Sequence, residues 1–244
     1  MITLYQFSSS PFTEKVSRIL SFKGLDYRVE EINRLKAKEY RDVSPFGKFP
    51  AMEILGEAVC DSTDIAHALE KSFPAKALFP KDESLKAQVH ILEDWADESL
   101  YFYEMTMRVT WLNNAKITLA KIKNTLPPLP DWLLLKIIMK KASKIVLMQG
   151  LGRKNKSQVV NDVQRHLNAI NALLSNSPWL VGDTITLADI AVIAQLNCLL
   201  DTPEVQEMME SLPAIRSWMD RVDEAAPYIR VADVASDEKE ASLC

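Results

Sequence analysis

Three consecutive hydroxyl side chains, Ser8, Ser9 and Ser10, stand directly before Pro11. An apolar run at residues 2–7 precedes them and predicts a strand, and a helical pattern follows from Pro11. Ser10-Pro11 is a helix-start signal, because a hydroxyl can cap backbone N–H groups and proline fits the first helical position. A strand that turns directly into a helix also gathers N–H donors and the positive end of the helix dipole. The stretch therefore suits a bound anion, and its plainer interpretation is a helix cap.

A second polar cluster, Asp61-Ser62-Thr63, comes before another helical pattern. A hydroxyl and first-turn N–H groups at such a place can hold a carboxylate, while the Asp61 carboxylate can pair with an ammonium group. The alternative is again a capping cluster, which Asp and Ser provide at the start of many helices.

The elements that must position these clusters follow one another in the first eighty residues. The pattern predicts strands at 2–7, 27–32, 50–54 and 57–60, the last two joined at Leu55-Gly56, helices from Pro11 and at 62–72, and a short helix or turn at 36–43. This βαβ plus ββα order is what a thioredoxin-like domain gives. Pro74, Pro80 and the residues between them are interpreted as a linker.

After the linker nearly every apolar pattern has a helical period. Helices are predicted at 84–114, 131–149, 155–174, 187–200 and 212–222. The 187–200 stretch is apolar nearly all round, so we expect it to be the buried central helix. Three prolines interrupt the pattern at 125–130, and 233–244 is expected to be a solvated acidic tail.

Length and composition fit a protein of two ordinary domains. The chain has 244 residues, 48% of them hydrophobic and 25% charged, which is the composition of a globular protein. Its three cysteines form neither a CxxC pair nor a metal-ligand spacing, so we expect no metal site and a reducing, cytoplasmic compartment. No signal peptide is expected at the N-terminus, and no apolar run is long enough to span a membrane.

Charge is distributed unevenly along the chain. Residues 115–156 contain ten basic side chains and one acidic side chain, although the whole chain has a net charge of −4. Within that segment, the helix predicted at 131–149 places Lys136, Lys140 and Lys144 on one face. It could line a pocket for an acidic hydrophobic substrate, make weak contact with an anionic membrane surface, or simply present a solvated lysine face.

Three motifs in order carry a resemblance to a known family. They are the run from Ser10 to Leu20 with Lys23-Gly24-Leu25-Asp26-Tyr27, the run from Ser44 to Pro50, and the run from Cys60 to Ile65. The first resembles the opening helix of the glutathione S-transferase superfamily, most of all the tau-like serine enzymes and the omega-like ones, where Ser-Pro-Phe or Cys-Pro-Phe begins the helix. Residues 182–190, with Thr186 and Asp189 three apart as in a capping box, match the folding signature of the family's helical domain.

The resemblance implies a thioredoxin-like glutathione-binding domain at 1–78 and an all-α domain at 84–232. It implies that Ser10 donates its O–H to the glutathione sulfur, with Ser8 or Ser9 as alternative donors. Phe49-Pro50 resembles the cis-proline dipeptide whose backbone pairs with the peptide. Asp61, Ser62 and Thr63 would hold the γ-glutamyl end. Lys48, or less favourably Lys36 or Lys38, would neutralise the glycine carboxylate.

The second substrate is less well specified by the sequence. Phe12 in the first motif is predicted to contact substrate, and Tyr103 and Trp111 are candidates for an apolar second-substrate site, although both could be core residues. The isolated histidines, His67, His90 and His166, are interpreted as surface residues.

The resemblance implies a glutathione transferase that attacks a hydrophobic electrophile, by conjugation or in peroxide reduction, with glutathione as co-substrate. It also implies a homodimer, no metal and no nucleic-acid partner. A glutathione-binding protein without turnover and a membrane-peripheral interaction module on the same fold are the alternatives.

Overall fold

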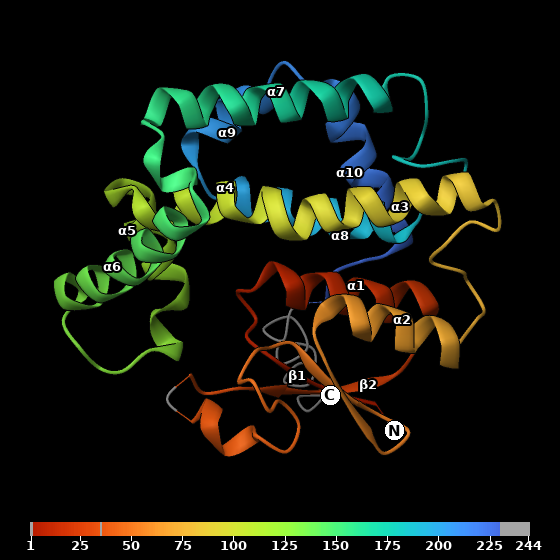
Figure 1. Cartoon of the computed structure of the whole chain (residues 1–244), viewed down its shortest axis with the longest axis horizontal. Coiled ribbons are helices and arrows are strands. Elements are labelled where there is room, and N and C mark those ends of the chain that lie inside the picture. The colour runs from red at the N-terminus through yellow and green to blue at the C-terminus, as the bar shows by residue number, and fades with distance from the viewer. Residues whose placement is uncertain (1, 35, 230–244) are drawn as a thin grey trace, which may run out of the picture. The chain divides into compact units, whose positions relative to one another are not determined.

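The computed structural model describes residues 2–34 and 36–229. The chain forms two compact units, one made of the residues up to Leu78 with the segment that begins at Asp223, the other of Phe79–Val222 (Figure 1). The first unit contains β1 (Ile2–Gln6), α1 (Pro11–Lys23), β2 (Tyr27–Glu31), the 3-10 helix η1 (Ala37–Tyr40), β3 (Ala51–Ile54), β4 (Glu57–Cys60) and α2 (Ser62–Ser72). This is the predicted order, and the thioredoxin-like fold class is confirmed.

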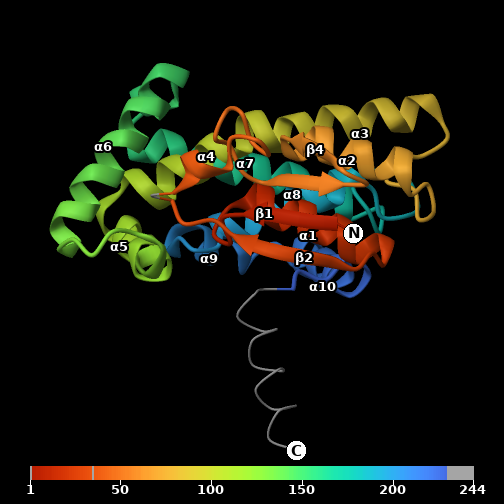
Figure 2. The same ribbon diagram turned by 90° about the horizontal axis from the view of Figure 1, so that it is seen from below.

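The four strands form one mixed sheet in the order β2-β1-β3-β4. β1 runs parallel to β2 and antiparallel to β3, and β3 and β4 form an antiparallel hairpin. Figures 1 and 2 show α1 and α2 together on one face of the sheet. They cover it with the fully buried side chains Val16, Ile19, Ile65 and Leu69, so the apolar stripes predicted from spacing form the core of this unit.

The opposite face of the sheet carries a smaller apolar cluster under the segment that follows β2. Its buried members are Ile32, Phe49 and Ala51, and the residues packed against them are Tyr5, Phe7, Ala37, Tyr40, Val43 and Cys60. The rings of Phe7 and Phe49 meet edge to face with centroids 5.1 Å apart. This cluster fixes the chain just before Pro50, and thus the approach to β3.

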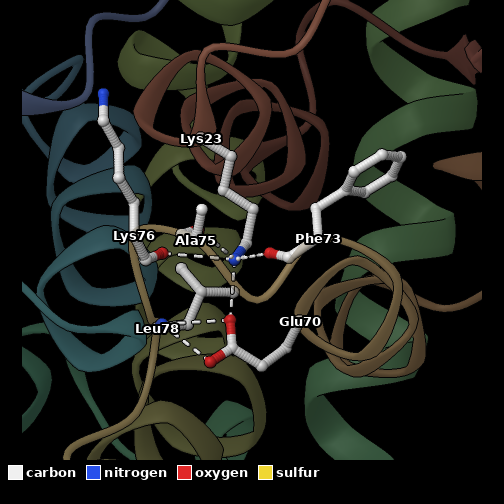
Figure 3. A network of polar contacts seen from close by, with 6 residues as sticks. All are labelled: Lys23, Glu70, Phe73, Ala75, Lys76 and Leu78. Atoms are coloured by element: carbon white, nitrogen blue, oxygen red, sulfur yellow. Dashed lines mark hydrogen bonds and ion pairs between the residues drawn. The ribbon is translucent and has the colours of Figure 1, made fainter.

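A buried lysine fastens the end of the sheet unit to the start of the linker (Figure 3). The Lys23 ammonium donates to a Glu70 carboxylate oxygen at 2.7 Å and to the carbonyl of Phe73 at 2.8 Å, and its side chain is 1% exposed. It also donates to the carbonyls of Ala75 and Lys76, while Glu70 accepts from the N–H of Leu78. One side chain thereby orders the 73–78 segment, which the sequence marks only by Pro74.

The second unit is helical. Its elements are α3 (Glu83–Trp95), the π-helix η2 (Ala96–Leu100), α4 (Tyr101–Met105), the π-helix η3 (Thr106–Thr110), α5 (Leu112–Ile122), the 3-10 helix η4 (Lys123–Thr125), α6 (Asp131–Gln149), the 3-10 helix η5 (Leu151–Arg153), α7 (Lys156–Leu174), α8 (Leu187–Leu199), α9 (Pro203–Met209) and α10 (Pro213–Ala225). Helix α8 is buried at every position but Asn197, which confirms the predicted central helix. Helix α9 was not predicted.

The single helix predicted at 84–114 is wrong at its C-terminal end. The helical run ends at Thr110, Trp111 takes an extended conformation, and α5 begins at Leu112. The Thr106 and Thr110 hydroxyls donate to the carbonyls four residues earlier. This side-chain bonding bends helices, so the two threonines give a physical reason for the irregular turns that an apolar period does not show.

The folding signature near residue 186 forms as predicted. The Asp189 carboxylate accepts from the backbone N–H of Thr186 at 2.9 Å and from that of Leu180 at 2.9 Å. It also accepts from the Trp218 indole N–H. Burial raises the pKa of the Asp189 carboxyl, even though these hydrogen bonds act in the opposite direction.

The prediction that the histidines are surface residues needs correction for two of the three. His166 and His90 are not plain surface residues: the His166 ring lies half-buried between Trp95 and Tyr103, and the His90 ring stacks on Phe79. The predicted acidic tail at 233–244 lies outside the described residues. In the part of the chain that is described, no helix has the length and apolar character needed to cross a bilayer.

Candidate functional site

The register of the sheet gathers three motifs that are far apart in the sequence. Ala51 pairs with Tyr5 on one side and with Cys60 on the other. One residue beyond these pairs stand Gln6, Pro50 and Asp61, so all three motifs leave the sheet at the same edge. β2 ends there as well, because Gln6 pairs with Glu31 in the parallel ladder. The turn at Ser8–Ser10 follows β1 at this edge.

Ser10 is the N-cap residue of α1 by position, but its hydroxyl makes no capping hydrogen bond. Its backbone N–H donates to the Phe7 carbonyl at 2.9 Å, and its own carbonyl accepts from Glu14 at 3.1 Å. The turn is thus held by its backbone. The plain cap interpretation of the Ser10 hydroxyl is not what the structure shows, whereas its role toward a ligand stays a prediction.

The two other serines of the turn have protein partners. Ser9 accepts a hydrogen bond from the Arg34 guanidinium at 3.1 Å. The Ser8 N–H donates to Glu31 at 2.9 Å, and its carbonyl accepts from the Tyr228 hydroxyl at 3.0 Å. Ser8 therefore anchors the turn through its backbone, and Ser9 connects the turn to a cation.

Arg34 is a candidate site residue that sequence reasoning missed. Its guanidinium lies 4.2 Å from the centroid of the Phe7 ring and bonds the hydroxyl next to Ser10. A positive charge at this place favours an anion near the N-terminus of α1. The sequence offers no signal for it, because Arg34 stands in a polar stretch after β2 and reaches the turn only through the parallel pairing.

Asp61 begins α2 with an unusual backbone conformation. Its φ is 81° and its ψ is 133°, a region that non-glycine residues rarely occupy at a cost of about 1–3 kcal/mol. Its carboxylate is exposed and accepts from the Thr63 N–H at 3.0 Å. Residues with such strain cluster at ligand sites. Here the Asp61 carboxylate lies exposed at the sheet edge and also caps α2.

Lys15 is the second residue that sequence reasoning missed. It is 1% exposed, and its ammonium donates to the Ser62 hydroxyl at 3.3 Å and to the Thr63 hydroxyl at 3.2 Å. A cation of α1 thereby polarises both hydroxyls at the start of α2, where the helix dipole is also positive. The arrangement can bind a carboxylate, and Asp61 beside it can bind an ammonium group.

The remaining candidates of the first unit differ in exposure. The Phe49–Pro50 peptide bond is cis, as predicted, and both side chains are buried. Lys48 is exposed, with its backbone carbonyl accepting from the Ser44 hydroxyl at 2.6 Å. Phe12 lies half-buried in the first turn of α1.

Tyr103 and Trp111 belong to the helical unit and are nearly buried there, at 9% and 8% exposure. The Tyr103 hydroxyl donates to Asp162 at 3.1 Å, and the Lys156 ammonium lies 4.8 Å from the centroid of a Trp111 ring. Both rings therefore have basic neighbours, since Lys154 and Arg165 also pair with Asp162. Their assignment to a second-substrate site stays a prediction.

Metal ligands do not gather in the described ranges. Among residues 2–34 and 36–229, no group of three or more His, Cys, Asp or Glu side chains is placed to hold a metal ion.

Two family models match the chain and together cover more than half of it. Residues 4–77 match the N-terminal domain of glutathione S-transferase, and residues 134–225 match its C-terminal domain. The chain therefore belongs to the glutathione S-transferase superfamily, a family of glutathione-dependent enzymes.

Individual relatives are distant or partial. A probable maleylacetoacetate isomerase 1 of Drosophila melanogaster is 34% identical over 35% of this chain, and the match spans 38% of that protein. The maleylacetoacetate isomerase of Mus musculus is 23% identical over 79% of this chain and 76% of its own. Among solved structures, the beta-etherase LigF of Sphingobium covers 98% of this chain and 99% of its own, at 23% identity and a TM-score of 0.67. The last likeness concerns the fold alone.

Proposed function

We propose that the chain is a glutathione transferase that ionises the glutathione thiol and directs it at a hydrophobic electrophile, by conjugation or in peroxide reduction. The observation that carries the proposal is the common sheet edge: the Ser10 turn, the cis Phe49–Pro50 bond and the Asp61-Ser62 helix start leave the sheet side by side. These are the three places where the family resemblance puts the sulfur, the peptide backbone and the γ-glutamyl end.

The Ser10 hydroxyl suffices in magnitude for thiol activation. Lowering a thiol pKa of about 8.5 by about two units takes roughly 2.7 kcal/mol. One hydrogen bond to a charged acceptor contributes about 1.5–3 kcal/mol, and the start of a helix adds about 0.3–1 kcal/mol. The hydroxyl does not serve as a cap, so it can donate to the sulfur without breaking a helix hydrogen bond.

The other end of glutathione would be held by α2. The polarised hydroxyls of Ser62 and Thr63 would receive the γ-glutamyl carboxylate, and Asp61 would pair with its ammonium group. Lys48, exposed before the cis bond, would meet the glycine carboxylate. Binding both ends places the sulfur next to the incoming electrophile, and such positioning is a main source of rate in reactions between two molecules.

A second reaction at the same site is favoured by the relatives named maleylacetoacetate isomerase. A thiolate that adds to an activated carbon–carbon double bond leaves a single bond free to rotate. Expulsion of the same thiolate then restores the double bond in the other geometry and regenerates glutathione. No atom is gained or lost, so isomerisation needs the same activated sulfur as conjugation.

Cellular setting and assembly are also proposals. Cys60 and Cys198 carry free thiols, which supports a cytoplasmic, reducing location, and homodimers are typical of the family.

The test is a titration with glutathione followed by thiolate absorbance, for wild type and for Ser10→Ala. Ser10→Ala should raise the pKa of the bound thiol by about one to two units and leave glutathione affinity nearly unchanged. Ser8→Ala and Ser9→Ala are matched controls, and a larger effect in either would move the donor assignment.

Turnover separates the alternatives. Glutathione affinity with neither conjugation, peroxide reduction nor isomerisation would show a binding protein without turnover. Lack of glutathione affinity in the folded protein would contradict the proposal altogether.

A further inference from the structure

Helix α6 presents an outer face that mixes large apolar side chains with lysines. Only Leu134, Ala142 and Val146 of its 19 residues are fully buried. We call the following exposed residues the α6 outer face: Trp132, Lys136, Ile137, Lys140, Lys141, Lys144, Leu147 and Met148. At about 100° per residue, these positions cover roughly half of the helix circumference.

The apolar members of this face are exposed to an unusual degree. Trp132 is 67% exposed, Met148 75%, Leu147 52% and Ile137 49%. Single exposed apolar residues are ordinary on a protein surface, but a group of them on one helix marks an interaction site.

Helix α7 provides an internal comparison. It also has 19 residues and packs in the same unit, with six fully buried positions. Among its large apolar residues only Leu173 is exposed, and the rest of its outer face is mostly Asn, Gln, Arg, Ser and Lys. The α6 outer face therefore does not follow from helix length or from position in a helical domain.

The charge of the α6 outer face is uncompensated. Within the described residues, none of Lys136, Lys140, Lys141 and Lys144 forms an ion pair, and the Asp131 carboxylate at the start of the helix pairs with Lys123. Like charges four residues apart on a helix destabilise it. The lysines thus contribute most when an anionic surface lies over them.

The combination favours a lipid surface over a protein partner. Lysine stems can lie along an apolar phase while their ammonium groups stay at phosphate depth, and tryptophan prefers the same interface. The bilayer interface offers both environments at adjacent depths. Its acyl chains would contact Trp132, Ile137, Leu147 and Met148, and its phosphates would contact the lysine ammonium groups. Figures 1 and 2 place α5 and α6 at the end of the helical unit away from the start of α3.

We propose that the α6 outer face docks the protein reversibly on anionic lipid bilayers. The contact is peripheral, because no described helix can cross a bilayer. The attraction of each lysine to an anionic surface corresponds to about a fivefold change in affinity, so three lysines account for on the order of 100-fold. Docking is independent of glutathione turnover, since none of these residues belongs to the candidate site of the sheet unit.

The experiment measures binding of the full chain to vesicles of phosphatidylcholine with and without phosphatidylglycerol, by co-sedimentation. The emission maximum of Trp132 is a second readout, because Trp132 is the exposed one of the five tryptophans while the other four are buried or half-buried. The test variant is Lys136→Gln/Lys140→Gln/Lys144→Gln. The matched control, Lys71→Gln/Lys81→Gln/Lys86→Gln, removes the same charge elsewhere, and circular dichroism checks that each variant folds.

We expect binding only to the anionic vesicles, its loss at high salt, a blue shift of emission that Trp132→Phe removes, and about 100-fold weaker binding in the test variant alone. Equal binding by the test and control variants would overturn the proposal. Binding to pure phosphatidylcholine would also overturn the proposal. A third contrary outcome is that wild type binds no vesicles but self-associates, and that the test variant abolishes the self-association, because a second copy of the chain would then cover the α6 outer face.

Discussion

Replacement of Lys15 by methionine tests whether α1 helps to hold the glutathione carboxylate. Lys15→Met removes the ammonium that contacts the Ser62 and Thr63 hydroxyls at 3.3 and 3.2 Å and keeps a similar apolar stem in a buried place. A carboxylate bound to these hydroxyls would lie about 5–6 Å from the Lys15 nitrogen. At an effective dielectric constant of about 20, this attraction is roughly 3 kcal/mol. Loss of the cation should therefore weaken glutathione binding by on the order of 100-fold.

The assay separates binding from chemistry. Calorimetry gives the glutathione Kd, and steady-state kinetics give KM for glutathione and kcat at saturation. Lys15→Met should raise Kd and KM and leave kcat and the pKa of the bound thiol unchanged, because the sulfur is bound at the other end of the tripeptide. Lys15→Arg keeps the charge and should retain most of the affinity.

A structural role would give a different result. If Lys15 only holds α1 against α2, Lys15→Met lowers the melting temperature while the folded protein binds glutathione as wild type does. That outcome, or an equal fall of kcat and kcat/KM, refutes the reasoning.

Three further predictions follow from the sheet unit. Asp61→Gly should relieve the backbone strain at φ 81°, so the melting temperature should stay the same or rise while glutathione affinity falls. Asp61→Asn should lose glutathione affinity without a rise in melting temperature. Calorimetry measures the affinity and thermal melts measure the melting temperature. Lys23→Met leaves the partly buried Glu70 carboxylate without its ammonium partner and should lower the free energy of unfolding by about 3–5 kcal/mol. Urea titrations measure this change. Lys71→Met, which replaces an exposed lysine, should not lower the free energy of unfolding by this amount. The hydrogen bond to Glu53 raises the pKa of Tyr5 to about 12. The stabilisation of the folded protein by this hydrogen bond is therefore present below pH 10 and lost as pH rises through about 12. In NMR titrations of labelled tyrosine, Glu53→Gln should move the midpoint of the Tyr5 titration back toward pH 10.

The sequence predicted well where local chemistry decides the structure. The hairpin at Leu55-Gly56, helix α2 from Ser62 to Ser72 and the Thr186 capping box all form from residues that are neighbours in the chain. Their signals are turn residues, caps and apolar spacing, which need no knowledge of the rest of the fold. The family motifs coincide with these strong local signals, so the amino-acid order alone was enough to select the candidate site residues around Ser10 and Asp61.

Two residues that the sequence did not mark are placed by contacts between distant segments. Lys15 has the type and spacing of an exposed helix residue, yet it is buried because α2 starts beside it. Arg34 reaches Ser9 only because β2 pairs in parallel with β1. The break at Trp111 comes from side-chain bonds of Thr106 and Thr110 within an unbroken apolar pattern. The first two features depend on tertiary context, whereas the break at Trp111 arises from side-chain bonds within one helical run that an apolar period does not reveal.

The geometry of the site depends finally on the register of one short hairpin. Leu55 and Gly56 both have positive φ, at 53° and 90°, as the two-residue turns that match the twist of a hairpin require. This turn pairs Ile54 with Glu57 and, at the far end of the ladder, Ala51 with Cys60. Pro50 and Asp61 are therefore the first residues past the same ladder. A slip of one residue would send every side chain of β4 to the opposite face. The turn at Leu55-Gly56 therefore determines, from the other end of the ladder, that Asp61 lies beside Pro50.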